Sequence, residues 1–434
     1  MDDPRQKRAR RRLRILMIGF AVAVAGVLVV HASYGRYISG RVEAHLQAIR
    51  DAGAPTSMDE LHRPPLAPDA NAMTLYRQAA ARLEALPPLS EEGDPIAAFS
   101  PCSGKKESGE CTLVPPDAAA LGQRLAQAQP ALTLLREASA CAGFQLPLKP
   151  DATGQNTVSM ADLQALRALS RYAAAQAWHE STQNHQEAAA AWLETAFELT
   201  RRLDAAPLLV TATVRTAMAS FAVNTAVNLF EQHPPSQECA LRIKEHLMAL
   251  RDTQGFVYAL ETERAFSLDG YAAQPEPPSA LAAYAVRPLH QRNVAGTLEL
   301  FAAMIAAVRE EEPAQRSAAY AAIDEQVEQG PMMVSLMGPA FLAGAKSLER
   351  LRAHCDLLLL AMALRVYRAE EGSYPGTLEG WHPERLALLP EDLYNGGGYG
   401  YHRQGEGFIL EHRVAAAEAL SSGPARPVVM RFVR

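Results

Sequence analysis

The chain has 434 residues, of which 48% are apolar and only 6% aromatic, and its formal net charge is −6. This length exceeds one ordinary core, and abundant alanine with few aromatic residues favours helix over sheet. Seven basic side chains lie within residues 5–14, so the rest of the chain is clearly acidic. This distribution argues against a nucleic-acid-binding surface on the main body.

The first predicted element is a transmembrane helix over residues 15–34, behind a basic cytoplasmic tail, residues 1–14. Ile15 to Val30 contains no charged residue, and the residues after it bring the segment to the length that crosses a bilayer. Basic residues ahead of an apolar span stay in the cytoplasm, so the bulk of the chain is expected in the periplasm, anchored to a bacterial inner membrane. A cleaved signal peptide is the alternative, although its apolar region is normally shorter.

Residues 35–156 are predicted to be helical, with an irregular insertion over residues 87–116 that is rich in proline, glycine and charge. Cys102 and Cys111 flank a polar loop in this insertion. In an oxidising compartment these two cysteines could form a disulfide that closes the loop. The chain has five cysteines, so at least one thiol stays free.

Residues 157–345 are predicted to form an α-helical core. Ser159 is expected to cap a helix that runs to about His179, and further helices are expected over residues 187–203 and 207–231. The first two of these would pack as an antiparallel pair joined by a polar turn. Such a pair resembles one unit of a tetratricopeptide array, so the core is predicted to be tetratricopeptide-like.

Residues 346–434 are predicted to form a small α+β module. A strong helix over residues 347–371 should end at Gly372, because glycine adopts the left-handed conformation of a C-cap. Alternating apolar residues from Tyr399 to Leu410 predict a hairpin, and residues 427–433 predict one more strand. The whole chain is thus expected to be mainly α, with one N-terminal membrane helix.

The sequence contains no motif from which a catalytic, cofactor-binding or metal-binding residue can be assigned. It has no Gly-x-Ser-x-Gly elbow and no His-Glu-x-x-His pair. His354, Cys355 and Asp356 are adjacent on a predicted helix, where neighbours point about 100° apart. The glycine-rich segment at residues 396–400 precedes strand-like residues, whereas a phosphate-binding loop precedes a helix.

One charged group on a predicted helix, Glu261, Glu263 and Arg264, could serve acid–base catalysis if it faces a cleft. A solvated surface or a structural ion pair is the simpler interpretation. Catalysis by this group would require Glu261 and Glu263 to be shielded from bulk solvent and to meet other polar groups.

Four stretches occur in an order that resembles a broad set of uncharacterised bacterial proteins with one N-terminal membrane span. They are PDANAMTLYRQAA (68–80), LREASACAGFQLPL (135–148), LQALRALSRYAAAQA (163–177) and ETERAFSLDG (261–270). Those proteins commonly end in a segment like residues 357–381. The resemblance implies an architecture and no reaction.

The segment from Ala363 to Pro375 resembles the start of the globular core of type II secretion pseudopilins, where a helix ends in a Gly-x-Tyr-Pro turn. This resemblance implies a small sheet packed on the helix. The aspartate-rich calcium loop of that family has no counterpart here, which weighs against a role in a secretion fibre.

These observations favour a non-enzymatic envelope scaffold that binds a protein partner and does not bind nucleic acid. No cofactor is assigned. An unrecognised envelope hydrolase and an accessory of secretion or pilus machinery are the alternatives. A small-molecule ligand cannot be named from the sequence.

Overall fold

The computed structural model describes residues 4–61, 63–87, 94–99, 116–150, 154, 156–232, 236–274, 277–378, 399–412 and 428–432. The α-helices are α1 Pro4–Asp51, α2 Ala72–Glu84, α3 Ala118–Ala140, α4 Met160–Thr182, α5 Gln186–Arg201, α6 Leu209–Gln232, α7 Gln237–Arg251, α8 Gln254–Ala272, α9 Ala280–Arg309, α10 Pro313–Gln329 and α11 Met332–Glu371. Short 3₁₀ turns are η1 Asp59–Leu61, η2 Pro95–Phe99 and η3 Arg202–Ala205. The strands are β1 Leu148–Pro150, β2 Asn156–Val158, β3 Tyr399–Gln404, β4 Gly407–His412 and β5 Val428–Phe432.

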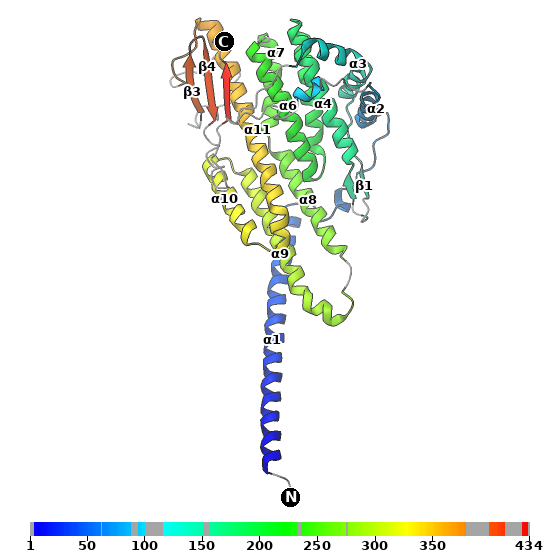
Figure 1. Cartoon of the computed structure of the whole chain (residues 1–434), viewed down its shortest axis with the longest axis vertical. Coiled ribbons are helices and arrows are strands. Elements are labelled where there is room, and N and C mark those ends of the chain that lie inside the picture. Colours follow the sequence, from blue (N-terminus) through cyan, green and yellow to red (C-terminus); the bar gives the residue numbers. More distant parts are fainter. Residues whose placement is uncertain are drawn as a thin grey trace.

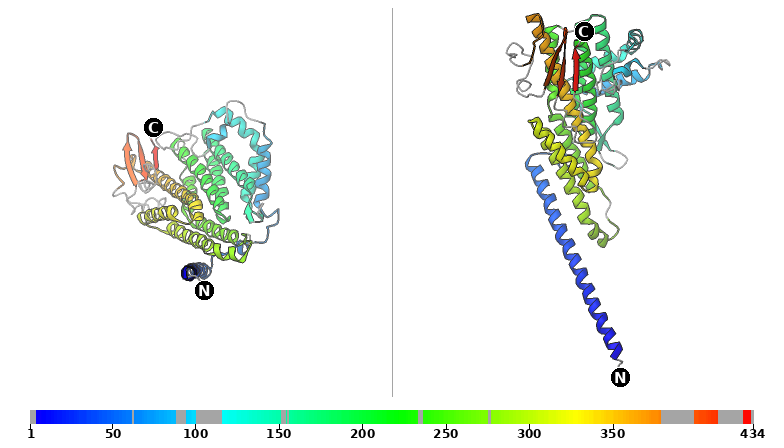
Figure 2. Two further views of the ribbon diagram at one scale, coloured as in Figure 1. Left: turned by 60° about the horizontal axis from the view of Figure 1, so that its bottom comes forward. Right: turned by 60° about the vertical axis from the view of Figure 1, so that its left-hand side comes forward.

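Helix α1 extends far beyond the helical body, and its C-terminal part packs on α9 (Figure 1). Among the described residues, α1 is the one helix long and apolar enough to cross a membrane, and its most apolar window is wholly exposed. Further along, the Ser39 hydroxyl donates to Gln291 Oε1 at 2.7 Å, and Ile49 packs in a small apolar cluster with Val294 and Leu298. Viewed along its axis, α1 lies at one edge of the body (Figure 2).

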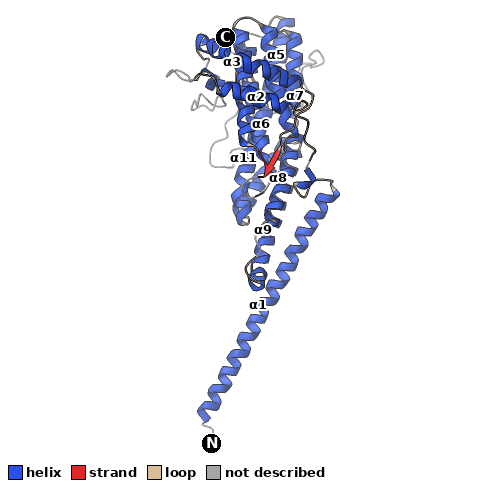
Figure 3. Ribbon diagram, turned by 90° about the vertical axis from the view of Figure 1, so that its right-hand side faces the viewer, coloured by secondary structure: helices blue, strands red, loops and turns tan. Residues whose placement is uncertain are grey.

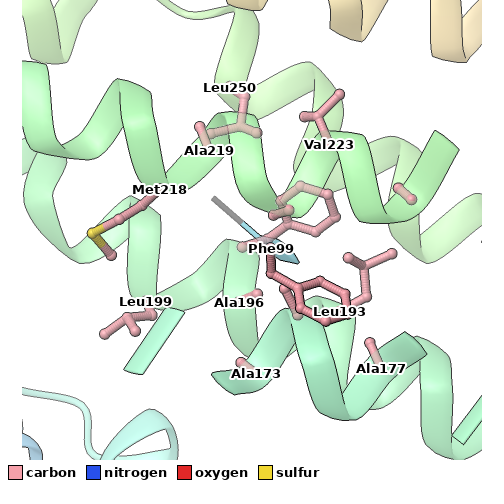
Figure 4. Close-up of a cluster of buried hydrophobic side chains, with 14 of the residues drawn as sticks. Phe99, Ala173, Ala177, Leu193, Ala196, Leu199, Met218, Ala219, Val223 and Leu250 are labelled. Atoms are coloured by element: carbon pink, nitrogen blue, oxygen red, sulfur yellow. The ribbon is translucent and has the colours of Figure 1, made fainter. Parts of the chain in front are cut away.

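The upper part of the body is an apolar core enclosed by α2 to α7. Alanines allow α4 and α5 to approach closely, because Ala173 and Ala177 on α4 and Ala196 on α5 are all fully buried. Figure 4 shows Phe99, from η2, among side chains of these helices and of α6 and α7. This density of small residues suits helix-on-helix packing.

Helix α11 joins two apolar clusters of the body. Its first half packs with α8, α9 and α10, whereas its second half packs with α6, α7 and the C-terminal sheet. Residues 357–364 are buried without a break, so this part of the helix is covered on every face. Forty residues make α11 about 60 Å long.

The C-terminal sheet is antiparallel with strand order β3-β4-β5 and covers the end of α11. Asp356 of α11 is 7% exposed and lies 2.6 Å from Arg251 Nε of α7, and the Tyr399 hydroxyl of β3 donates to its other oxygen at 2.8 Å. This charged pair therefore fastens the sheet to two helices. The short antiparallel β1–β2 ribbon belongs to a separate sheet and is drawn red in Figure 3.

Several predictions from the sequence are confirmed. Ser159 caps α4 by accepting a hydrogen bond from the Asp162 amide, and Gly372 ends α11 with a φ of 79°. The helices expected near residues 187–203 and 207–231 are α5 and α6, and the predicted hairpin and last strand are β3, β4 and β5. The tetratricopeptide-like array stays a prediction, since α4 and α5 form one helical pair.

The boundary at residues 345–346 falls inside α11, which runs unbroken through Gly338 and Pro339. Cys102 and Cys111 lie outside the described residues, as do Gly396 to Gly398. Cys141, Cys239 and Cys355 are free thiols.

Candidate functional site

The charged group on α8 is divided among three surroundings. Glu261 lies 3.1 Å from Arg309 Nη2 at the end of α9, and its side chain is 19% exposed. Glu263 faces the start of α6, and Arg264 is buried at 5% exposure. The two carboxylates therefore serve different elements and do not form a paired acid and base.

Glu263 caps α6. Its Oε2 accepts a hydrogen bond of 2.9 Å from the Leu209 amide, the first residue of that helix. The preceding residue, Leu208, has a φ of 74° and donates its amide to the Thr262 hydroxyl at 2.8 Å. Burial raises the pKa of Glu263 above its ordinary value, against the opposing effect of the Leu209 amide. Two consecutive residues of α8 thus hold the entry of α6 in place.

Arg264 interacts electrostatically with Glu261 and Arg309. Among the described residues, its Nε and Nη2 atoms have no hydrogen-bond partner. Burial lowers the pKa of this guanidinium, and the charge of Arg309 adds to the effect. The Arg264 guanidinium contributes positive potential to the surface formed by Glu261 and Arg309, which we call the charged wall.

A polar pocket of about 470 Å³ opens beside this wall. It is formed by the first turn of α8, the end of η3, Arg63 of the extended segment after η1, Arg215 of α6 and Arg309 of α9. Its lining residues are Arg63, Asp204, Ala205, Arg215, Asp252, Gln254, Gly255, Val257, Tyr258, Glu261 and Arg309.

Most charges of the polar pocket are already neutralised by one another. Arg215, only 3% exposed, forms an ion pair with Asp204, and burial raises the pKa of this aspartate. Asp252 accepts a hydrogen bond from the Gln254 amide at 2.9 Å. Gly255 is required at the wall, because a Cβ there would lie 2.7 Å from Asp204 Oδ1.

A second, mainly apolar pocket of about 280 Å³ adjoins the first. It lies between the segment after η1, the segment before β1 and the η3–α6 junction. Its lining residues are Leu61, Arg63, Pro65, Phe144, Gln145, Leu146, Pro147, Leu148, Ala205, Ala206, Pro207 and Tyr258. Gln145 fixes one wall, since its side chain accepts from the Leu66 amide at 2.8 Å.

Arg63, Ala205 and Tyr258 line both pockets, which we call together the double pocket. Arg63 is exposed, and its side chain makes no ion pair with the described residues. The double pocket therefore offers an apolar surface beside a cation and a helix N-terminus. A ligand with an apolar part followed by an acidic group would match it.

The group His354, Cys355 and Asp356 is not assembled for nucleophilic chemistry. Cys355 is fully buried, and burial strongly raises the pKa of its thiol. The His354 ring bonds the carbonyl of Arg350 at 2.9 Å, and Asp356 pairs with Arg251. Within the described part of the chain, no cluster of three or more histidine, cysteine or acidic residues could hold a metal ion.

The sequence predicted Glu261 as a candidate but missed Arg63, Asp204 and Tyr258. These residues come from segments far apart in the chain, and none belongs to a motif. The proline residues near Arg63 and at Pro207 mark where the segments turn, which was the available signal.

The chain was compared with protein-family models, with curated proteins and with solved structures, and none of these comparisons gave a match. The resemblances to single-span bacterial proteins and to pseudopilins therefore stay predictions.

Proposed function

We propose that this chain is a membrane-anchored, non-enzymatic scaffold that binds a segment of a protein partner in its double pocket. The observation that carries the proposal is the adjacency of an apolar pocket and a polar pocket that share Arg63 and Tyr258. An extended segment with an apolar side chain followed by an acidic one or by a terminal carboxylate would satisfy both parts.

The position of the double pocket favours a ligand from the aqueous space. Arg309 and Tyr284 lie on the same helix, α9, and Tyr284 contacts α1 at Leu28. At 1.5 Å per residue, the pocket residue lies roughly 37 Å along α9 from this contact. If α1 spans a membrane, the double pocket stands well clear of the bilayer, out of reach of acyl chains.

The compartment that we propose follows from the charges that flank α1. The basic tail would stay in the cytoplasm, and the helical body would lie in the periplasm beside the inner membrane. There, the double pocket would meet envelope proteins. The tetratricopeptide-like arrangement is part of the same proposal, as helical arrays commonly present grooves to partners.

Site-specific photo-crosslinking tests the proposal. A photoreactive phenylalanine analogue in place of Tyr258, in the full chain in living cells, should give a discrete adduct that disappears when Arg63→Glu is added. The same analogue at Leu241, which is 38% exposed on α7 and lines neither pocket, serves as the control. Identical adducts from both positions, or an adduct at Tyr258 that ignores Arg63→Glu, would contradict partner binding in the double pocket.

The envelope hydrolase is a second candidate because Glu261 lines the polar pocket and is not open to bulk solvent. Its weakness is that Glu263, the other predicted carboxylate, caps α6 instead. An accessory role in secretion rests only on the resemblance of residues 357–410.

A further inference from the structure

The first turns of α9 carry large apolar side chains that no other described part of the body covers. Leu281 is 77% exposed, Val286 46% and Leu289 61%. Figures 1 and 3 show that the start of α9 is the part of the body that reaches furthest along α1. This apolar surface therefore lies beside the helix predicted to cross a membrane.

Contacts between α9 and α1 fix the height of this surface. The Tyr284 hydroxyl donates to the carbonyl of Leu28 at 3.3 Å, and the His31 ring bonds the carbonyl of Tyr284 at 2.8 Å. A Cβ at Gly35 of α1 would lie 3.5 Å from Pro288 Cγ, so the two helices remain close one turn later. Leu28 and His31 lie in the outer half of the uncharged segment between Arg14 and Arg36, so Tyr284 lies about one turn inside the outer end of the span.

The residues around this contact have the composition of a membrane–water interface. Residues 277–298 contain no aspartate or glutamate, and Arg287 and Arg292 are exposed. Tyr34 and Tyr37 of α1 are 42% and 62% exposed, and they lie about one and two turns further out along α1 than His31, which bonds Tyr284. Tyrosine collects at the headgroup level of bilayers, and exposed arginines above an apolar face attract anionic lipid.

We propose that residues 280–290 of α9 lie in the outer interface of the membrane that α1 spans, so that lipid covers Leu281, Val286 and Leu289. This inference rests on the proposed anchoring by α1. Two contacts with the bilayer would fix the rotation and tilt of the body, which a single helix cannot do. The double pocket would then be held at a constant height above the lipid surface.

Quenching of tryptophan by lipids with brominated acyl chains tests this proposal in the full chain, reconstituted into phosphatidylcholine–phosphatidylglycerol vesicles. The test variant is Leu281→Trp. Phe20→Trp, 73% exposed on α1, reports whether α1 lies in the bilayer. Leu336→Trp is the matched control, because Leu336 is 71% exposed but lies on α11, whose start packs against Gly296 of α9, roughly 18 Å beyond Tyr284.

The emission that Leu281→Trp adds to that of the parent chain should be largely lost in brominated vesicles, as should that of Phe20→Trp, whereas that of Leu336→Trp should persist. Quenching of Phe20→Trp without quenching of Leu281→Trp would overturn the interfacial contact and leave the anchor standing. If brominated lipid quenched neither Phe20→Trp nor Leu281→Trp, the anchoring by α1 would itself be overturned. If Leu281→Trp were protected from aqueous iodide but not quenched by brominated lipid, protein would be covering this residue. That result would also overturn the proposal.

Discussion

At the scale of single residues, two largely buried ion pairs contribute to the stability of this fold. The Asp204–Arg215 pair lies at the wall of the double pocket, and the Asp356–Arg251 pair lies beneath the C-terminal sheet. Burial raises the pKa of both aspartates, so each pair depends on its arginine to remain charged. Removal of one partner leaves an uncompensated buried charge, which costs much more than loss of the whole pair.

The substitution Arg215→Met should lower the free energy of unfolding by about 1–3 kcal/mol at neutral pH, because it removes the cation that opposes the desolvation of the Asp204 carboxylate. The double change Asp204→Leu with Arg215→Met should cost less. Urea denaturation of the full chain in detergent measures both effects, with Asp51→Asn, at an exposed position, as the control. A double variant less stable than Arg215→Met would contradict this account of the pair.

At the scale of elements, helix ends and helix crossings depend on residues from neighbouring helices. Glu263 of α8 caps α6, and Gly338 of α11 allows α10 to approach, since a Cβ there would lie 2.2 Å from Val327 Cγ2. Neither role follows from local sequence. Both depend on contacts between helices that only the folded chain brings together, which is why the sequence alone left Glu263 as a candidate catalytic carboxylate.

The cap predicts an unusual dependence on pH. The pKa of Glu263 is raised in the folded state, so the folded protein holds its proton more tightly than the unfolded chain. Its contribution to stability therefore falls as pH rises from the ordinary value of 4.5 through the raised pKa. Glu263→Gln keeps an acceptor for the Leu209 amide and lacks this titration, so its stability relative to wild type should increase over that pH range and then level off.

Glu263→Ala is the companion to this variant. It removes the acceptor, so its free energy of unfolding should lie about 1 kcal/mol below that of Glu263→Gln at every pH, because neither variant carries the titrating carboxyl group. Thermal unfolding at several pH values compares the three chains. A constant difference between Glu263→Gln and wild type from acid to neutral pH would contradict the raised pKa.

The crossing of α10 and α11 gives a second element-scale prediction. Alanine normally stabilises a helix interior relative to glycine, but Gly338→Ala should destabilise the chain by about 1–3 kcal/mol through overpacking against Val327. Adding Val327→Ala should recover part of this loss. Gly40→Ala, at a helical glycine with no neighbour within 4 Å, should not destabilise and serves as the control in the same melts.

The sequence could predict features whose signals are local and could not predict those made by distant segments. Ser159, Gly372 and the alternation around Tyr401 each specify their own structure within a few residues. The continuity of α11 past Pro339 depends instead on packing against α8 to α10. The double pocket joins residues as distant as Arg63 and Arg309, and such closure is decided only by the folded core.

At the scale of the whole molecule, we expect α1 to be a membrane helix that continues directly into the body. Its apolar part is exposed, and its later turns pack on α9 through Ser39 and Ile49. An exposed helix of this composition is costly in water and stable in a bilayer. The position of the double pocket and the proposed lipid contact of α9 both follow from that placement.

The most direct test of this claim is the topology of the chain, measured with alkaline phosphatase fused after Ala52 and, separately, after Arg434. Both fusions should be enzymatically active, since both sites would lie outside the cytoplasm, and the full-length protein should sediment with membranes. An uncleaved product in the soluble cytoplasmic fraction, with inactive fusions at both positions, would contradict the account.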